Sequence, residues 1–112
     1  MPSKLARKYI TRSMIDVAWT VDGAHVPGEV ADNDITTAVE VGAGNLCRIT
    51  VAAGAAVIVA FGDSGVATPS GAVSEVSLRF PNLATEKVYY VLATGDYIRG
   101  TVALTHLEVI RV

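Results

Sequence analysis

The sequence predicts an all-β protein, a single β-sandwich or jelly-roll-like domain of about eight strands that carries an extended N-terminal arm. A chain of 112 residues suits one domain. Its residues are 51% apolar and only 18% charged, and Val, Ile and Thr are abundant, which favours strands. Turn signals recur at short intervals, as an all-β domain requires, and we expect little helix.

The N-terminal third contains two segments that alternate apolar and polar residues. The first predicted strand is Ile15–Val21, which stops at Asp22-Gly23. Residues 24–34 are predicted as a loop, because Pro27 removes a ladder donor and Asn and Asp favour turns. The second predicted strand is Ile35–Val41, which ends at a Gly-Ala-Gly-Asn turn.

Two apolar strands are predicted in the middle of the chain. They are Leu46–Ala52 and Ala55–Phe61, and the Ala53-Gly54 step between them predicts a hairpin. The second strand is apolar on both faces, so we expect it to lie centrally in a sheet. Cys47 lies in the first strand and is interpreted as a small core residue.

A Gly-, Ser-, Thr- and Pro-rich stretch, residues 62–71, is predicted as an exposed loop. The next predicted strand is Ala72–Phe80, whose apolar residues Val76, Leu78 and Phe80 face away from their polar neighbours. Three further predicted strands complete the domain: Lys87–Ala93, expected to be buried, Tyr97–Thr105 and His106–Val112.

Charge is distributed unevenly along the chain, although the net charge is only −2. Residues 1–13 are predicted as a basic arm and residues 14–112 as the β-sandwich domain. Either the arm is a solvated tail, or it binds an acidic neighbour or nucleic acid. Nucleic acid is the weaker alternative, because one aromatic residue among four cations makes a narrow basic face. The candidate partner-binding residues of the arm are Lys4, Arg7, Lys8, Tyr9 and Arg12.

Several classes of site and location are not expected. A single cysteine excludes an internal disulfide framework and any multi-thiolate metal site. His25 and His106 have no metal-ligand spacing, and we expect no cofactor. No apolar run is long enough for a membrane span, and the N-terminus lacks the apolar core of a secretion signal. We therefore expect folding in a reducing cytoplasm.

The stretch Phe61-Gly62-Asp63-Ser64-Gly65 resembles two hydrolase motifs. GDSG resembles the nucleophile block of chymotrypsin-like proteases, and FGDS resembles the first block of GDSL esterases. The sequence does not contain the pattern of catalytic partner residues that either family requires. Without a general base, a serine hydroxyl is not activated as a nucleophile. Ser64 is therefore interpreted as part of an Asx turn in which Asp63 bonds to local backbone, and no enzyme activity is expected.

The segment from about Asn45 to Val102 resembles small β-rich structural proteins of tailed bacteriophages. In those proteins a phrase close to YVAFGTSPVAT leads through a loop to GDKIAVI…GTLYVT. The matching places here are held by Val59-Ala60-Phe61-Gly62-Asp63-Ser64 and Gly95-Asp96-Tyr97-Ile98. The N-terminal arm is not part of this pattern, nor is the acidic stretch after it, in which six acids and no base occur from Asp16 to Glu40.

The resemblance implies a virion component, made in the host cytoplasm, such as a decoration protein that staples the major capsid protein on the outside of the shell. We expect a homodimer or homotrimer at a symmetric lattice site. A head–tail connector or tail component is the nearest alternative. A carbohydrate-binding module and a small hydrolase remain alternatives of other classes. The first would need an exposed aromatic platform from Trp19, Tyr89, Tyr90 and Tyr97, for which core packing is the competing interpretation.

Overall fold

The computed structural model describes residues 28–72 and 74–111. These residues form eight strands and no helix, so the all-β prediction is confirmed for them. In chain order the strands are β1 (Glu29–Val30), β2 (Val39–Glu40), β3 (Leu46–Val51), β4 (Val57–Gly62), β5 (Leu78–Phe80), β6 (Lys87–Leu92), β7 (Tyr97–Gly100) and β8 (His106–Ile110). The predicted arm, the predicted strand Ile15–Val21 and His25 lie outside the described residues.

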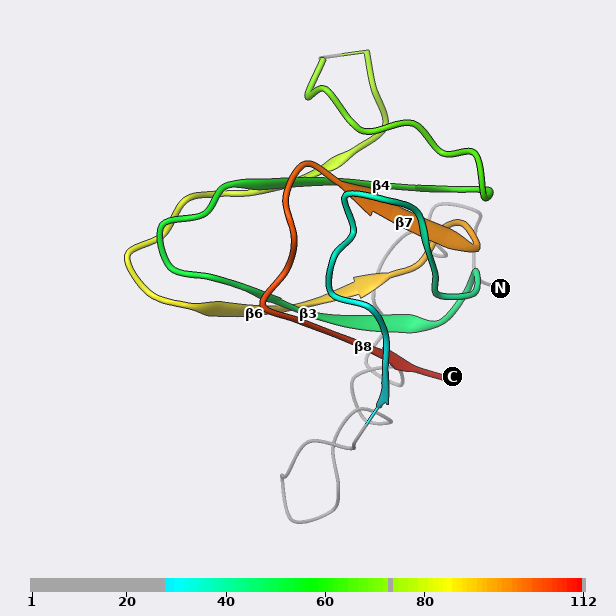
Figure 1. Ribbon diagram of the computed structural model, residues 1–112, viewed down its shortest axis with the longest axis horizontal. Coiled ribbons are helices and arrows are strands. Elements are labelled where there is room, and N and C mark those ends of the chain that lie inside the picture. Colours follow the sequence, from blue (N-terminus) through cyan, green and yellow to red (C-terminus); the bar gives the residue numbers. More distant parts are fainter. Residues whose placement is uncertain (1–27, 73, 112) are drawn as a thin grey trace, which may run out of the picture.

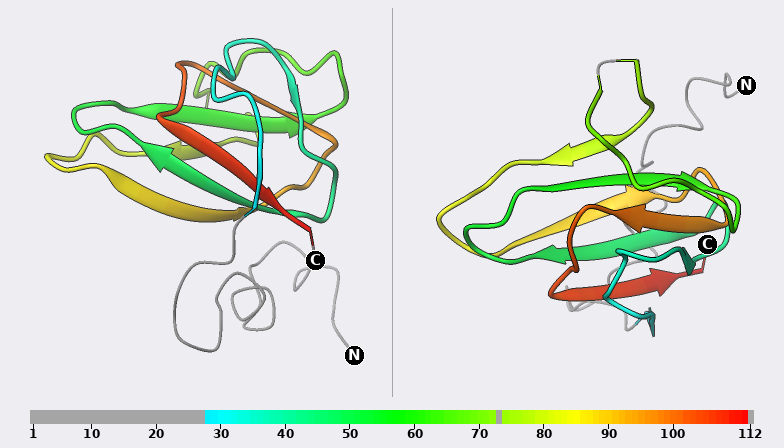
Figure 2. Two further views of the ribbon diagram at one scale, coloured as in Figure 1. Left: turned by 60° about the horizontal axis from the view of Figure 1, so that its bottom comes forward. Right: turned by 45° about the horizontal axis from the view of Figure 1, so that its top comes forward.

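The strands form two antiparallel four-stranded sheets in a β-sandwich-like arrangement (Figure 1). The first, which we call the β3 sheet, has the order β1-β8-β3-β6, and the second, the β4 sheet, has the order β2-β7-β4-β5. Figure 2 shows the two layers from other sides. The predicted strand Ala55–Phe61 was expected to lie centrally in a sheet. This is confirmed, because β4 lies between β7 and β5.

The predicted hairpin at Ala53-Gly54 is wrong. β3 pairs with β6 and β8, whereas β4 pairs with β5 and β7, so the two strands belong to different sheets. Gly54 does turn the chain, with φ of 77°, but its N–H donates to the carbonyl of Leu83 at 2.8 Å. Residues 52–56 are long enough to cross the roughly 10 Å between stacked sheets.

The core lies between the sheets and is organised by β3. Its inner face contributes Cys47, Ile49 and Val51, which pack with Val57 and Val59 of β4. All six residues of β3 are buried, on both faces of the strand. The prediction for Cys47 is confirmed, and burial raises the pKa of its thiol to about 12. The thiol is therefore protonated and unreactive at neutral pH.

Near the N-terminal end, pairing departs from the predicted pattern in two places. The predicted loop 24–34 contains β1, which forms because β8 offers it a partner edge. The predicted strand Ile35–Val41 is reduced to β2, because the Asp34 carboxylate accepts hydrogen bonds from the hydroxyl and the N–H of Thr36 and turns the chain. The hydrogen bond from the Thr36 hydroxyl is the main cause that holds the pKa of Asp34 below its ordinary value, and the bond from the Thr36 N–H acts in the same direction.

The other predicted strands are also shorter or less buried than expected. In Ala72–Phe80 only β5 is a strand, because the Glu75 carboxylate accepts the N–H groups of Ser70 and Gly71 and holds a turn there. Of the predicted inward-facing row only Phe80 is buried. β6 is an edge strand whose first residues are exposed, and β7 ends at Gly100 rather than at Thr105.

We predict that Gly95→Ala destabilises the fold. A Cβ at Gly95 would lie 2.6 Å from the backbone nitrogen of Gly62, whose strand position is fixed by pairing with Tyr97. We expect a loss of about 2 kcal/mol in the free energy of unfolding, measured by urea denaturation. The control is Gly65→Ala, where a Cβ comes only within 3.4 Å of Asp63, and a change below about 0.5 kcal/mol is expected. Equal losses in the two variants would contradict this account.

Candidate functional site

The strongest candidate for a functional surface is a groove between β5 and β6. Among the described strands, β5 pairs only with β4 and β6 only with β3, so these two are the edges of their sheets on the same side of the molecule. The groove, which we call the open groove, has a volume of about 560 Å³. Its apolar lining includes Val59, Phe61, Leu78, Phe80, Tyr89 and Val91.

The rim of the open groove exposes apolar side chains to solvent. Phe80 and Tyr89 join the two sheets across the groove, with ring centroids 4.5 Å apart. Val76 is 94% exposed and Leu78 43% exposed along the β5 side. An apolar groove bounded by edge strands is typical of a surface that another protein covers, since exposed edges and apolar patches otherwise promote aggregation.

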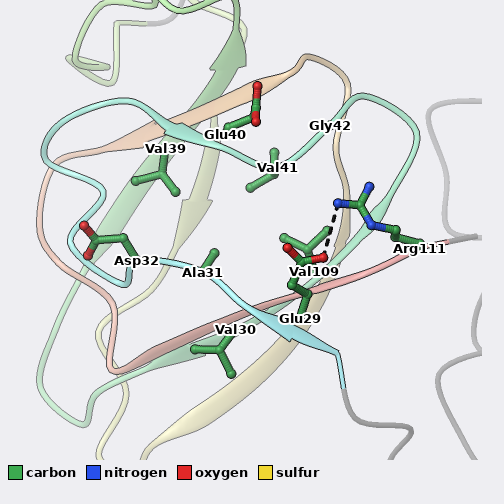
Figure 3. A pocket seen from close by; sticks show the side chains of 10 residues that line it. All are labelled: Glu29, Val30, Ala31, Asp32, Val39, Glu40, Val41, Gly42, Val109 and Arg111. Carbon is green, nitrogen blue, oxygen red and sulfur yellow. Dashed lines mark hydrogen bonds and ion pairs between the residues drawn. The ribbon is translucent and has the colours of Figure 1, made fainter.

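The opposite side of the sandwich carries a smaller groove between β1 and β2, of about 310 Å³ (Figure 3). Its carboxylates are those of Glu29, Asp32 and Glu40, and they are accompanied by Arg111. Arg111 bonds to Glu29 at 3.2 Å, and both side chains are about two-thirds exposed. The carboxylates point apart, and the described residues contain no group of three His, Cys, Asp or Glu side chains that suits a metal ion.

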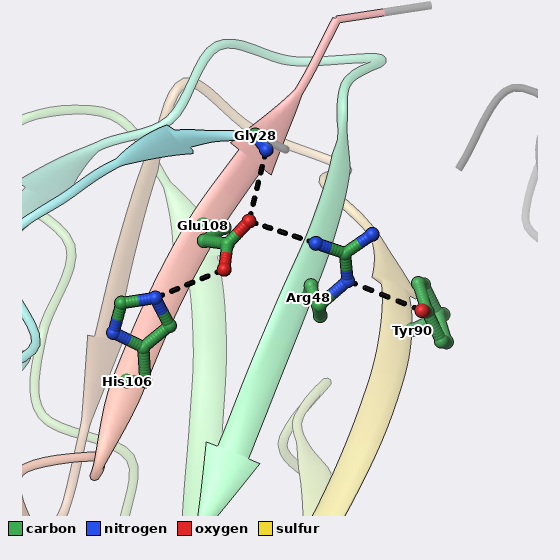
Figure 4. Close-up of polar contacts among 5 residues, drawn as sticks. All are labelled: Gly28, Arg48, Tyr90, His106 and Glu108. Atoms are coloured by element: carbon green, nitrogen blue, oxygen red, sulfur yellow. Dashed lines mark hydrogen bonds and ion pairs between the residues drawn. The ribbon is translucent and has the colours of Figure 1, made fainter. Parts of the chain in front are cut away.

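A third feature is a polar cluster on the outer face of the β3 sheet (Figure 4). Its centre is Glu108, whose Oε2 accepts from Arg48 Nη1 at 2.8 Å and from the Gly28 N–H at 2.9 Å. Glu108 Oε1 lies 3.0 Å from His106 Nε2. Arg48 also donates to the Tyr90 hydroxyl at 3.1 Å. The strand register brings these residues together, because Arg48 lies directly opposite both Glu108 and Tyr90.

The cluster stabilises charge in a largely buried place. Arg48 is only 5% exposed. Partial burial acts to raise the pKa of Glu108, but the bonds from Gly28 and His106 and the charge of Arg48 outweigh it, so the pKa lies below its ordinary value. This carboxylate is therefore ionised at neutral pH and compensates the buried guanidinium, which would be costly without it.

The structure does not bring Ser64 together with His106. Ser64 is exposed in the turn after β4, where the Asp63 carboxylate accepts the Gly65 N–H at 2.8 Å, as the predicted Asx turn requires. His106 lies on the outer face of the other sheet, where it contacts Glu108, so the sandwich core separates the two side chains. The other histidine of the hydrolase hypothesis, His25, is outside the described residues.

The described tyrosines do not form one aromatic face. Tyr89 and Tyr90 are neighbours in β6 and point to opposite sides of the sheet, with Tyr89 packed against the core. Tyr97 belongs to the β4 sheet. Trp19, the fourth member of the predicted sugar platform, lies outside the described residues, as do the arm residues Lys4, Arg7, Lys8, Tyr9 and Arg12.

Sequence reasoning missed the polar cluster and the open groove. A signal for the cluster was present, because Arg48 and Glu108 each occupy a mid-strand position between apolar residues, which is typical of buried and paired charges. No local signal marks the open groove, since it depends on which strands end up at the edges of the two sheets.

Comparison with known proteins adds no identification. No family model, curated protein or solved structure matches the chain. Within residues 28–72 and 74–111, no helix is long and apolar enough to cross a membrane.

We predict that Glu108→Gln lowers the free energy of unfolding at neutral pH by about 3 kcal/mol, because the largely buried ion pair between Glu108 and Arg48 is lost. The exposed pair gives a matched control, and Glu29→Gln should cost less than about 1 kcal/mol. Both values come from urea denaturation, and similar losses in the two variants would contradict the assignment.

The same carboxylate predicts a pH dependence. Because the pKa of Glu108 is lowered in the folded state, its contribution is present above its ordinary pKa, about 4.3, and is lost as the pH falls through the lower folded value. The fall in stability between about pH 5 and pH 3 should therefore be smaller in Glu108→Gln than in the parent protein. Equal acid dependence would show that Glu108 does not hold a lowered pKa.

Proposed function

We propose that the protein is a non-enzymatic virion structural protein, a capsid decoration protein that binds the outer surface of the major capsid protein shell and stabilises it. The observation that carries the proposal is the open groove. An apolar surface between two edge strands suits a protein whose role is to bind another protein. An extended coat segment would pair with β6 and place apolar side chains against Leu78 and Phe80.

The order of the strands supports this proposal. Each strand pairs with the one that mirrors it in the chain: β1 with β8, β2 with β7, β3 with β6 and β4 with β5. We infer that the eight strands are a jelly roll, in which one long antiparallel hairpin is rolled into two sheets. Jelly rolls are found in viral capsid proteins, lectins and cupins, so this support is an analogy of fold.

The resemblance to phage structural proteins adds support from particular residues. Its two phrases lie in β4 with the following turn and at the start of β7. These two strands are neighbours in the β4 sheet, with Phe61 opposite Ile98 and Gly62 opposite Tyr97. The matching phrases therefore belong to one structural unit of the described fold, although they are distant in the sequence.

In the proposed mechanism the sandwich is a rigid body that binds one coat subunit through the open groove. The basic arm, residues 1–13, binds an acidic surface of a neighbouring subunit and so bridges the joint between them. A homodimer or homotrimer at a symmetric site would bind several subunits at once, and this multivalency compensates for modest affinity at each contact.

A head–tail connector or tail component is the second candidate within the same class, because the open groove suits any virion partner. A carbohydrate-binding module has less support, since Tyr89, Tyr90 and Tyr97 do not share an exposed face. A sugar-array screen separates that module from a protein-binding role.

We predict that Leu78→Asp lowers the affinity for undecorated capsids of the virus that carries the gene by at least about tenfold, or about 1.4 kcal/mol. The charge would be placed on the apolar rim at a side chain that is already 43% exposed, so the fold should tolerate it. The measurement is co-sedimentation of the full chain with the capsids. Val102→Asp is the matched control, at a 39% exposed apolar residue after β7, and it should bind as the parent does.

Absence of binding by the parent protein would overturn the decoration role. Equal binding by both variants would exclude the open groove as the contact. Replacing Lys4, Arg7, Lys8 and Arg12 by Ala in the full chain tests the arm, because the salt dependence of binding should then weaken. Unchanged affinity and salt dependence would contradict its role.

A further inference from the structure

The β5 side of the open groove is built by a loop as well as by a strand. Val76, Ser77 and Leu78 line the groove there, and of these three only Leu78 belongs to β5. The pairing of β5 with β4 runs from Leu78 to Phe80. Val76 lies beyond the last pair of this register, and its side chain is 94% exposed. Strand pairing alone therefore does not fix this part of the rim.

The Glu75 carboxylate holds the segment that leads to Val76. Both of its oxygens accept the N–H of Ser70, at 2.9 and 3.1 Å, and Oε2 also accepts the Ser70 hydroxyl at 3.1 Å. Oε1 accepts the N–H of Gly71 at 3.1 Å. These bonds, with the one from the Ser70 N–H as the main cause, hold the pKa of Glu75 below its ordinary value. The carboxylate is therefore ionised at neutral pH and joins the two ends of the turn by charge-assisted bonds.

The same turn is attached to the β4 sheet. Arg79 of β5 donates from its guanidinium to the carbonyl of Gly71. A Cβ at Gly71 would lie 2.9 Å from Cδ1 of Ile58 in β4, so the Gly71 backbone packs directly on the sheet. Figure 2 shows the loop between β4 and β5 on the outer side of the β4 sheet. Because Glu75 holds the N–H of Gly71 and Arg79 holds its carbonyl, the turn is fixed relative to the strands that line the groove.

We propose that Glu75 is a positioning residue of the open groove, which holds Val76 in place at the rim before a partner binds. The inference rests on the proposed function for the identity of the partner and adds how the same site is prepared for it. A rim that is already ordered binds more tightly, because binding does not have to offset the entropy of fixing it. Without the carboxylate, the N–H groups of Ser70 and Gly71 would bond to water, and the segment before β5 would lose its fixed conformation.

The first test measures local order in the full chain without any partner, by nitrogen relaxation NMR. Glu75→Ala should lower the backbone order parameter of the Val76 amide from about 0.85 to below about 0.6. The matched control is Glu40→Ala, which removes the same charge from an exposed side chain of β2, at the opposite edge of the β4 sheet, and should keep the parent value. Amides of β3 should keep their order in both variants, because the sandwich stays folded. An unchanged order parameter at Val76 in Glu75→Ala, or an equal fall in Glu40→Ala, would overturn the proposal.

The second test measures co-sedimentation of the same variants with undecorated capsids of the virus that carries the gene. Glu75→Ala should bind about fivefold more weakly than the parent, and Glu40→Ala should bind as the parent does. Glu75→Gln keeps one acceptor oxygen, so its affinity should lie between those of the parent and Glu75→Ala. A fall in order at Val76 with unchanged affinity in Glu75→Ala would overturn the role of Glu75 at the groove.

The two measurements separate the role of Glu75 from the proposed function. If the parent protein does not bind capsids, the proposed function is overturned, while the order parameter of Val76 still decides whether Glu75 holds the rim. If the parent binds and Val76 stays ordered in Glu75→Ala, the proposed function stands and the positioning role is overturned.

Discussion

The pairing of β3 with both β6 and β8 is the interaction on which the rest of the structure depends. These neighbours come from the distant C-terminal half of the chain, so the fold closes only when both halves are in place. On its inner face β3 supplies Cys47, Ile49 and Val51 to the core. On its outer face the same register brings Arg48 opposite Glu108, and the buried charge is compensated. One strand therefore positions both the core residues on the inner face of the sheet and the ion pair on its outer face.

The mirrored pairing of the strands also determines which strands become the edges of the two sheets. Because β4 and β5 pair at the middle of the chain, the short β5 and the neighbouring β6 become the edges on one side of the sandwich. The side chains between them, such as Phe61 and Tyr89, remain partly open to solvent as the wall of a groove. The proposed function depends on this feature of the fold, since the surface that we propose for the partner is the groove that the strand pairing leaves open.

The sequence predicted β3 and β6 well because the strand pattern of each is local. Leu46–Ala52 and Lys87–Ala93 are apolar apart from Arg48, Thr50 and Lys87, and β3 and β6 occupy them almost completely. The Ala53-Gly54 turn was predicted as a hairpin because a turn signal gives a change of direction and not the partner strand. β1 was missed because its two residues are held by β8, far along the chain.

The candidate site was harder to predict for the same reason. Arg48 and Glu108 are 60 residues apart, and only the register of β3 and β8 makes them neighbours. Val76 and Leu78 follow the strand pattern, yet no described strand covers them, since β5 is an edge. Alternation predicts which side chains share a face, but it does not predict whether that face is covered.

The most direct measurement of the central claim, that the open groove binds the partner, is amide hydrogen exchange of the full chain, free and bound to undecorated capsids. Binding at the groove should slow exchange along β6 and in residues 76–80, while amides of β3, already protected in the free protein, change little. Unchanged exchange along β6 and residues 76–80, together with new protection elsewhere on the surface, would contradict the account.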